Sequence, residues 1–280
     1  MSLQARLQRR IQRYGWDLAA NAYEFLWQQQ LSAAHQRLLT LAAPSTGETV
    51  LDVASGTGLM ALAVADRVGP RGQVIGVDIS ERMVVASQQR ADALALDNAI
   101  FQRMDGEQLD FADASFDLVI CALGLMYMPD PDQALREIQR VLRPGGRVVL
   151  AVWGERSHCG WSAVFPIVDA EVTSEVCPMF FQLGYAGALT ALCEQAGLIG
   201  VAEQRITAPL HYANAQEACD AAFVGGPVAM AWSRFDELTR RRVQQRYLEA
   251  IAEWKLGDGY RVPGEFVLML AQKPIVQMER

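Results

Sequence analysis

Short apolar runs alternate with longer amphipathic segments through the first half of the chain. Five runs have the length and composition of buried strands, at about 50–54, 73–78, 100–104, 116–122 and 147–153. The intervals between them show helical spacing of apolar residues, at about 59–68, 80–96 and 131–142. Repeated β-α-β units of this kind have parallel strands and right-handed crossovers. The pattern therefore predicts a doubly wound α/β sheet with helices on both faces.

The pattern differs at the two ends of the chain. From Leu3 to about Leu41 the spacing is helical, and we expect the helix to be interrupted near Tyr14-Gly15. Residues 143–146, Arg-Pro-Gly-Gly, predict a turn before the fifth strand. Beyond Trp153 we expect an irregular segment and then four elements, a helix at about 186–196, a strand at about 201–210, helices over 214–256 and a last strand at 265–271.

Composition narrows the class of protein. The chain has 280 residues, half of them apolar, which is enough for one large core without disulfides. A net charge of −7 argues against nucleic acid as the main partner, and we expect the basic runs 6–13 and 240–242 to lie on solvated helix faces. The sequence shows neither a secretory leader nor a membrane-spanning apolar stretch, so we expect a cytoplasmic protein with no membrane partner.

The cysteines do not predict a metal site. Cys121, Cys159, Cys177, Cys193 and Cys219 are irregularly spaced and include no C-x-x-C pair. We interpret them as reduced, buried thiols. A soft substrate held by Cys159 and Cys177, such as a thiol or arsenite, is a lesser alternative.

The segment from Thr49 to Gly58, T-V-L-D-V-A-S-G-T-G, predicts a nucleotide-type cradle. Gly56 and Gly58 allow a tight turn and close approach of a ligand to the backbone. Because Gly56 opens a G-x-G-x-x-A sequence and Asp78 follows 20 residues after Gly58, a dinucleotide is the first interpretation. Asp52 would repel a pyrophosphate and suits a cationic amino-acid ligand better.

Three further segments distinguish between these ligands. They are V-I-G-V-D-I-S at 74–80, M-D-G-E-Q-L at 104–109 and the run from Phe116 to Arg147. Together with the cradle, they resemble the class I S-adenosylmethionine-dependent methyltransferases, in particular the small-molecule branch that includes the quinone-biosynthesis C-methyltransferases. The resemblance covers roughly Tyr14 to Trp153.

The resemblance implies a set of cofactor contacts. Asp52 would organise the methionine moiety, Asp78 would accept both ribose hydroxyls, and Ile79 would pack on the adenine. The carboxylate of Asp105 and the next N–H would read the adenine edge. Ala54 replaces the family's first glycine. The implied cofactor-binding residues are Asp52, Ala54, Gly56, Gly58, Asp78, Ile79, Met83, Asp105, Gly106 and Cys121, whose carbonyl would face the methionine ammonium.

The sequence predicts the residues that bind the methyl acceptor less precisely than those that bind the cofactor. The quinone-biosynthesis relatives commonly have His-His after the fourth strand, where this chain has Met126 and Tyr127, so a quinone acceptor stays open. We expect His35 to be at the surface and take His158 and Tyr127 as candidate catalytic groups. The expected substrate pocket is apolar and aromatic, with candidates Tyr14, Tyr23, Met126, Trp161, Phe223 and Trp232.

The segment 225–227, Gly-Gly-Pro, is either the hinge of a lid or a packing turn.

These observations favour one function and keep two alternatives. We expect methyl transfer from S-adenosylmethionine to a small, mainly apolar organic acceptor, with the nucleophile (C, O, N or S) and the oligomeric state unassigned. An NAD(P)-dependent oxidoreductase and a non-catalytic S-adenosylmethionine-binding protein are the alternatives.

The predicted organisation is a single methyltransferase domain over 1–280, built on a mostly parallel, seven-stranded Rossmann-like sheet. It would comprise an N-terminal helical extension (1–45), a cofactor-binding core (46–153), an irregular insertion (154–185), the remaining core (186–212 and 262–280) and a helical cap (213–261).

Overall fold

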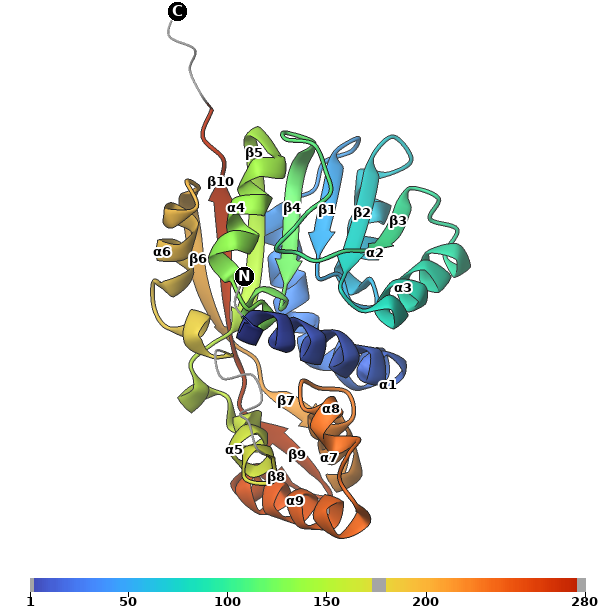
Figure 1. Cartoon of the computed structure of the whole chain (residues 1–280), viewed down its shortest axis with the longest axis vertical. Helices are drawn as coiled ribbons and strands as arrows, with labels where there is room; N and C mark the ends of the chain where they lie inside the picture. Colours follow the sequence, from blue (N-terminus) through green and yellow to red (C-terminus); the bar gives the residue numbers. More distant parts are fainter. Residues whose placement is uncertain (1–2, 173–179, 276–280) are drawn as a thin grey trace, which may run out of the picture.

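A seven-stranded sheet forms the body of the molecule, as seen in a computed structural model that describes residues 3–172 and 180–275 (Figure 1). Its strand order is β3-β2-β1-β4-β5-β10-β6. The strands are β1 (Thr49–Val53), β2 (Gln73–Asp78), β3 (Ala99–Arg103), β4 (Phe116–Ala122), β5 (Leu142–Trp153), β6 (Ile199–Thr207) and β10 (Glu265–Gln272). Strands β1 to β5 are parallel, and β10 is antiparallel to both of its neighbours. The predicted mostly parallel, seven-stranded α/β sheet is confirmed.

Between the strands lie the helices α2 (Leu59–Val68), α3 (Glu81–Ala93), α4 (Pro131–Val141) and α6 (Ala188–Gln195). Two of them, α3 and α4, begin at residues whose side chains cap the helix. The Ser80 hydroxyl accepts a hydrogen bond from Met83 N at the start of α3, and Asp130 accepts one from Gln133 N at the start of α4. Because the strand order reverses between β1 and β4, the sheet opens a crevice at their carboxyl ends.

The N-terminal helix α1 (Leu3–Ala42) is continuous, so the expected interruption near Tyr14-Gly15 is wrong. A Cβ placed on Gly15 would lie 3.7 Å from Met230 Cβ, which is ordinary packing. One glycine costs a helix only about 0.5–1 kcal/mol and does not end it. In Figure 1 the first half of α1 crosses the carboxyl ends of β1 and β4.

A second lobe lies on the other side of α1 (Figure 1). It contains α5 (Val164–Asp169), α7 (Ala215–Phe223), α8 (Ala229–Trp232), α9 (Glu237–Ala250) and an antiparallel sheet of β7 (Leu210–Tyr212), β9 (Gly259–Val262) and β8 (Lys255–Leu256). Short 3₁₀ turns occur in both parts of the molecule, at 125–127, 156–158, 160–163, 182–184 and 252–254.

The lobe departs from the expected elements in three ways. The segment 213–261 is not wholly helical, because β8 and β9 form a hairpin around Gly257, whose φ is +62°. The strand expected at about 201–210 is divided into β6 and β7. The segment 154–185 includes the helix α5, although residues 173–179 lie outside the described part.

The turn predicted at 143–146 is part of β5. The strand begins at Leu142 and shifts its register against β4 between Phe116 and Leu118. Gly145 has φ +79°, and its N–H donates to Lys273 O at 2.9 Å. The Pro-Gly-Gly sequence therefore bends an extended chain instead of ending it.

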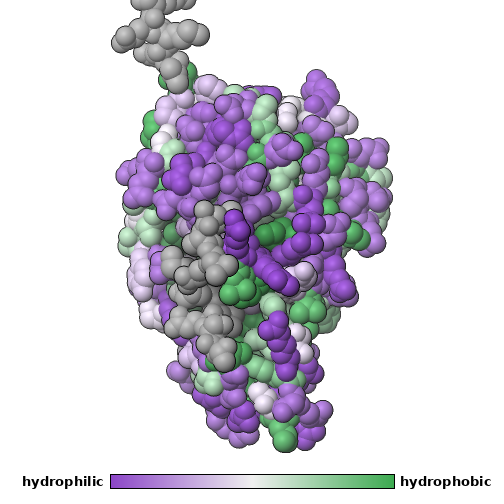
Figure 2. Space-filling view, viewed as in Figure 1, coloured by the Kyte–Doolittle hydropathy of each residue, from purple (hydrophilic) through white to green (hydrophobic). Residues whose placement is uncertain are grey.

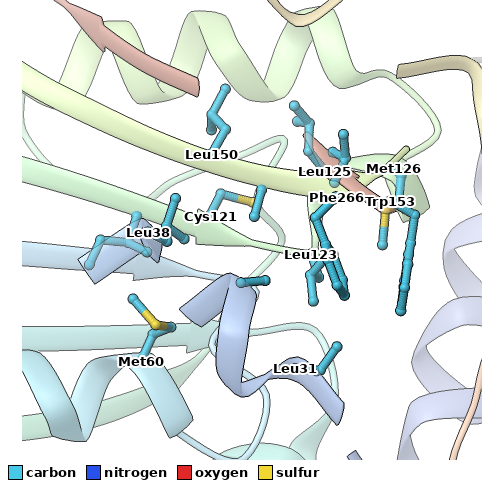
Figure 3. Packing of buried hydrophobic residues seen from close by; sticks show 14 of the residues in the cluster. Leu31, Leu38, Met60, Cys121, Leu123, Leu125, Met126, Leu150, Trp153 and Phe266 are labelled. Atoms are coloured by element: carbon cyan, nitrogen blue, oxygen red, sulfur yellow. The ribbon is translucent and has the colours of Figure 1, made fainter. Parts of the chain in front are cut away.

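The central strands and α1 share one apolar core. Figure 3 shows Leu31 and Leu38 of α1 near residues of β4, β5 and β10. Trp153 stacks on Phe266 across β5 and β10 with ring centroids 4.2 Å apart. Hydrophilic residues cover most of the face seen in Figure 2. Over the described residues, no helix has both the length and the apolar character needed to cross a bilayer.

Two glycine substitutions test this packing. Gly76→Ala places a Cβ 2.4 Å from the buried Phe101 ring, so we expect a loss of about 1–3 kcal/mol in the free energy of unfolding. Gly15→Ala meets no such obstacle and should raise it by about 0.5–1 kcal/mol. Urea unfolding of both variants measures the difference, and equal stabilities would contradict the packing described.

Candidate active site

The loop between β1 and α2 has an unusual backbone. Ala54, Gly56 and Gly58 all have positive φ, of 58°, 54° and 81°. Ser55 N donates to Val77 O at 3.0 Å, which fastens the loop to β2. A non-glycine residue in the left-handed region is strained, and such strain concentrates at functional sites. The loop makes the tight turn that its glycines predicted.

Ala54 is accommodated by a glycine on the neighbouring strand connection. A Cβ built on Gly124 would lie only 2.3 Å from Ala54 Cβ. The methyl group at position 54 therefore fills space that Gly124 leaves free. This pairing explains structurally why alanine replaces the family's first glycine.

Asp78 at the end of β2 is the best-connected acidic group of the site. It is 7% exposed, and its two oxygens accept hydrogen bonds from Gly56 N and Ser80 N, both at 2.9 Å. Burial raises the pKa of Asp78 to about 6, although these N–H groups lower it in part, and the charge of Asp17 adds to the rise. Burial, and then the Asp78 charge, raises the pKa of Tyr23.

Asp52 lies behind the cradle and has no hydrogen-bond partner for either oxygen among the described residues. It is 1% exposed, and burial raises its pKa to about 8; the nearby Ala61 N–H partly offsets this, and the Asp78 charge adds to it. Ser55 and Thr57 hydroxyls are likewise buried without partners. These groups and His35 line a small pocket of about 30 Å³.

His35, which its polar neighbours predicted to lie at the surface, is partly buried and lines this small pocket. Burial lowers its pKa to about 4, so the imidazole is neutral. Because the small pocket shares Tyr23, Ala54, Gly56 and Ala122 with the main cavity, His35 and Asp52 line a pocket that adjoins that cavity.

The main cavity has a volume of about 110 Å³ and lies at the carboxyl edge of the sheet. Many predicted site residues contribute to its wall, namely Tyr23, Ala54, Gly56, Asp78, Ile79, Met83, Asp105, Gly106, Tyr127 and Trp161. The acidic groups come from the ends of β2 and β3, and the aromatic groups lie toward α1 and the second lobe. The cavity thus has a charged end and an aromatic end.

Other predicted residues lie outside the cavity wall. Cys121 and Met126 are buried, and burial raises the pKa of the Cys121 thiol to about 12. Tyr14 is 43% exposed, with the guanidinium groups of Arg10 and Arg13 over its ring. Further residues that do not line the cavity are Gly58, which begins α2, and Phe223 and Trp232, which stack on each other in the second lobe.

His158 is placed away from the cavity. Its side chain is 55% exposed, and Nδ1 lies 3.1 Å from Glu265 Oε1. Glu265 also accepts hydrogen bonds from Arg205 and from Glu155 N. The geometry thus gives His158 a place in a polar cluster and leaves Tyr127, which lines the cavity beside Trp16, as the better-placed candidate.

Sequence reasoning missed a set of cavity residues on α1. Helical spacing predicts the helix but not which stripe of it faces the cavity. That stripe carries Arg9, Gln12, Trp16, Trp27 and Leu31, beside the predicted Tyr23. Glu107, Met104 and Trp153 were also missed. Gly226 and Pro227, predicted as part of a hinge or turn, line the cavity between α7 and α8.

No group of acidic, histidine or cysteine side chains that could hold a metal occurs within residues 3–172 and 180–275. Cys121, Cys159, Cys193 and Cys219 are buried free thiols, and Cys177 lies outside the described residues. The proposed pair of Cys159 and Cys177 is therefore not tested.

Comparison with known sequences identifies the core. Residues 44–177 match the family model described as a methyltransferase domain. A ubiquinone/menaquinone biosynthesis C-methyltransferase of Hahella chejuensis is 47% identical over 105 residues, which are 37% of this chain and 42% of that relative. The chain spans about half or less of the length of the curated relatives that it matches. The resemblance predicted from the four motifs is confirmed over this part of the chain.

Solved structures extend the likeness to the whole fold. The cyclase SpnF matches with a TM-score of 0.60 at 21% identity, over 89% of this chain and 84% of that one. A phosphoethanolamine N-methyltransferase of Haemonchus contortus, solved with phosphomonomethylethanolamine and S-adenosylhomocysteine, matches with a TM-score of 0.58 at 20% identity, over 92% and 57%. Likeness at this identity shows the shared fold alone.

The orphan carboxyl of Asp52 predicts a pH-dependent stability. Because the folded protein keeps this proton up to about pH 8 while the unfolded chain releases it near pH 4, the stability contribution of Asp52 falls as pH rises between these values. Asp52→Asn should remove that loss, so its stability relative to wild type should be higher by a few kcal/mol at pH 8 than at pH 5. Asp66→Asn, at an exposed position in α2, is the control, and a pH-independent difference for Asp52→Asn would contradict the prediction.

Proposed function

We propose that this protein transfers a methyl group from S-adenosylmethionine to a small, mainly apolar organic acceptor in the cytoplasm. The observation that carries the proposal is the buried carboxylate of Asp78, which binds the Gly56 and Ser80 N–H groups on the cavity wall inside a methyltransferase domain. Its position at the end of β2 is where a carboxylate can accept ribose hydroxyls.

The charges of the site suit a cationic ligand. Asp52 is a buried acid without a partner, and such a group is costly unless a ligand completes it. An α-ammonium group of the methionine tail would supply both charge and donors, and the Ser55 and Thr57 hydroxyls lie in the same pocket. A pyrophosphate would instead meet the carboxylates of Asp78 and Asp105, which disfavours a dinucleotide.

The main task of the protein is then to position the acceptor against the methyl group, because the methyl group needs little further activation. S-adenosylmethionine, when bound, supplies a methyl group already activated by its sulfonium. Asp78, Asp105 and Asp52 would hold the ribose, adenine and methionine parts, so that the methyl group faces the aromatic end of the cavity. Holding an acceptor in line with that carbon supplies much of the rate enhancement.

The aromatic end supports an apolar, ring-containing acceptor. Trp27, Trp153 and Trp161 line it, with ring centroids 4.8–6.1 Å apart. The indole N–H groups of Trp27 and Trp161 have no hydrogen-bond partner among the described residues, so an oxygen atom on the acceptor would satisfy them. Residues 46–153 would thus bind the cofactor, and α1 with the 213–261 segment would complete the acceptor end.

Tyr127 is proposed as the group nearest the chemistry. It lines the cavity and contacts Trp16 and Phe180 edge-on, at 5.0 and 5.1 Å between centroids. In this proposal its hydroxyl orients or deprotonates the acceptor. A quinone-type acceptor, suggested by the name of the Hahella relative, belongs in the first substrate panel, although Met126-Tyr127 stands where those enzymes commonly have two histidines.

The fold does not decide between methyl transfer and other uses of the same site. The likeness to a cyclase keeps the non-catalytic or non-methylating use of S-adenosylmethionine as the second candidate. Tight cofactor binding without turnover of any acceptor in the panel would favour this candidate.

Calorimetry with S-adenosylhomocysteine and NAD tests the cofactor assignment. Wild type should bind S-adenosylhomocysteine and not NAD, and Asp78→Ala should weaken S-adenosylhomocysteine about 100-fold, because two ribose hydrogen bonds to a charged group are lost. Asp66→Ala should bind like wild type. Unchanged affinity of the Asp78 variant, with its fold verified by circular dichroism, would overturn the site assignment.

Methyl transfer to the acceptor that emerges from the panel tests the catalytic groups. Tyr127→Phe should lower kcat by about 10- to 100-fold, while His158→Ala should change it less than twofold because His158 lies outside the cavity. A larger loss of kcat in His158→Ala than in Tyr127→Phe would favour His158 as the catalytic group.

A further inference from the structure

One basic side chain on α1 reaches the charged end of the cavity. Arg9 Nε lies 3.0 Å from Asp105 Oδ2, and its Nη2 contacts Glu107 Oε2. All three residues line the main cavity. The side chains of Arg9 and Glu107 are 15% and 1% exposed, whereas that of Asp105 is 31% exposed. The Asp105 carboxylate, which would bind the adenine, is thus partly exposed to the cavity while it also contacts Arg9.

Glu107 is itself fixed and gives Arg9 a rigid second anchor. Its Oε1 accepts a hydrogen bond from Asp130 N at 3.0 Å, at the start of α4. Its own N–H donates to Asp105 Oδ1 at 3.0 Å. The guanidinium therefore spans two carboxylates that are tied to each other and to α4.

The hydrogen-bonding capacity of Asp105 leaves room for a ligand. An ionised carboxylate has about four lone-pair sites on its two oxygens. The Glu107 N–H occupies one site on Oδ1, and the Arg9 guanidinium lies 3.0 Å from Oδ2 as an ion pair. The carboxylate therefore keeps lone pairs that can accept the N–H of an exocyclic amine.

Arg9 also controls the charge state of this acceptor. Burial raises the pKa of Asp105, and the positive charge of Arg9 opposes that rise. A protonated carboxyl would present an O–H in place of one lone pair, which is a poor match to an amine. Arg9 thus acts on both the orientation and the ionisation of the same group.

We propose that Arg9 is a positioning residue that holds the Asp105 carboxylate as the acceptor for the 6-amino group of the cofactor's adenine. The proposal deepens the S-adenosylmethionine assignment above and rests on it. In this arrangement α1 is more than a cover for the cavity, because it contributes directly to recognition of the base through a residue that does not itself touch the adenine.

Two ligands separate positioning from general stabilisation. S-adenosylhomocysteine carries the 6-amino group, and the analogue with unsubstituted purine in place of adenine lacks it. Arg9→Gln should weaken S-adenosylhomocysteine about tenfold and leave the purine analogue within twofold, since one hydrogen bond to a charged group is worth roughly one to two powers of ten. Arg9→Lys should recover part of the loss. Arg10→Gln, on the exposed side of α1, should change neither affinity.

A double-mutant cycle tests whether Arg9 acts through Asp105. Asp105→Asn should reduce the preference for adenine over purine, and adding Arg9→Gln to it should cause no further loss. Equal weakening of both ligands by Arg9→Gln, or additive effects in the double variant, would overturn the proposal. Failure of wild type to bind S-adenosylhomocysteine would instead overturn the proposed function. Thermal unfolding of each variant verifies that the comparison is made on folded protein.

Discussion

The candidate site depends on one buried carboxylate. Asp78 joins the loop after β1 to the start of α3 through the Gly56 and Ser80 N–H groups. Without an acceptor at this place, two backbone donors near the cavity would be left unpaired, which costs about 1–3 kcal/mol each. The burial that makes these bonds effective also raises the pKa of Asp78. The Asp78 side chain therefore has a structural role in the loop and a proposed role in ligand binding.

The helix α1 is tied to this region by polar contacts along its length. Arg9 contacts Asp105, Asp17 accepts a hydrogen bond from the Ser80 hydroxyl at 2.6 Å, and Glu24 lies 3.0 Å from Arg90. These contacts connect α1 to the ends of β2 and β3 and to α3. Its inward face can then present Trp16 and Trp27 to the cavity in fixed positions. The charged end and the aromatic end of the site are held by one element.

The sequence predicted the sheet and the cradle well because both rest on local patterns. Buried parallel strands read as continuous apolar runs, and Gly56 and Gly58 mark the turn directly. The contribution of α1 depended on which helix face meets the sheet, which spacing alone does not reveal for Arg9 or Trp27. The position of His158 depended on its tertiary partner Glu265. Hairpin β8–β9 was missed because Gly257 stood beside a strongly helical pattern.

The contact between positions 54 and 124 has a meaning for the history of the family. The two Cβ positions overlap, so only one of the two residues can carry a side chain in this backbone. Alanine at position 54 therefore depends on glycine at position 124 in this backbone. Among related sequences the two sites should covary as an exchange of one methyl group between neighbouring strands. In this chain the two positions share one methyl-sized volume, which Ala54 occupies.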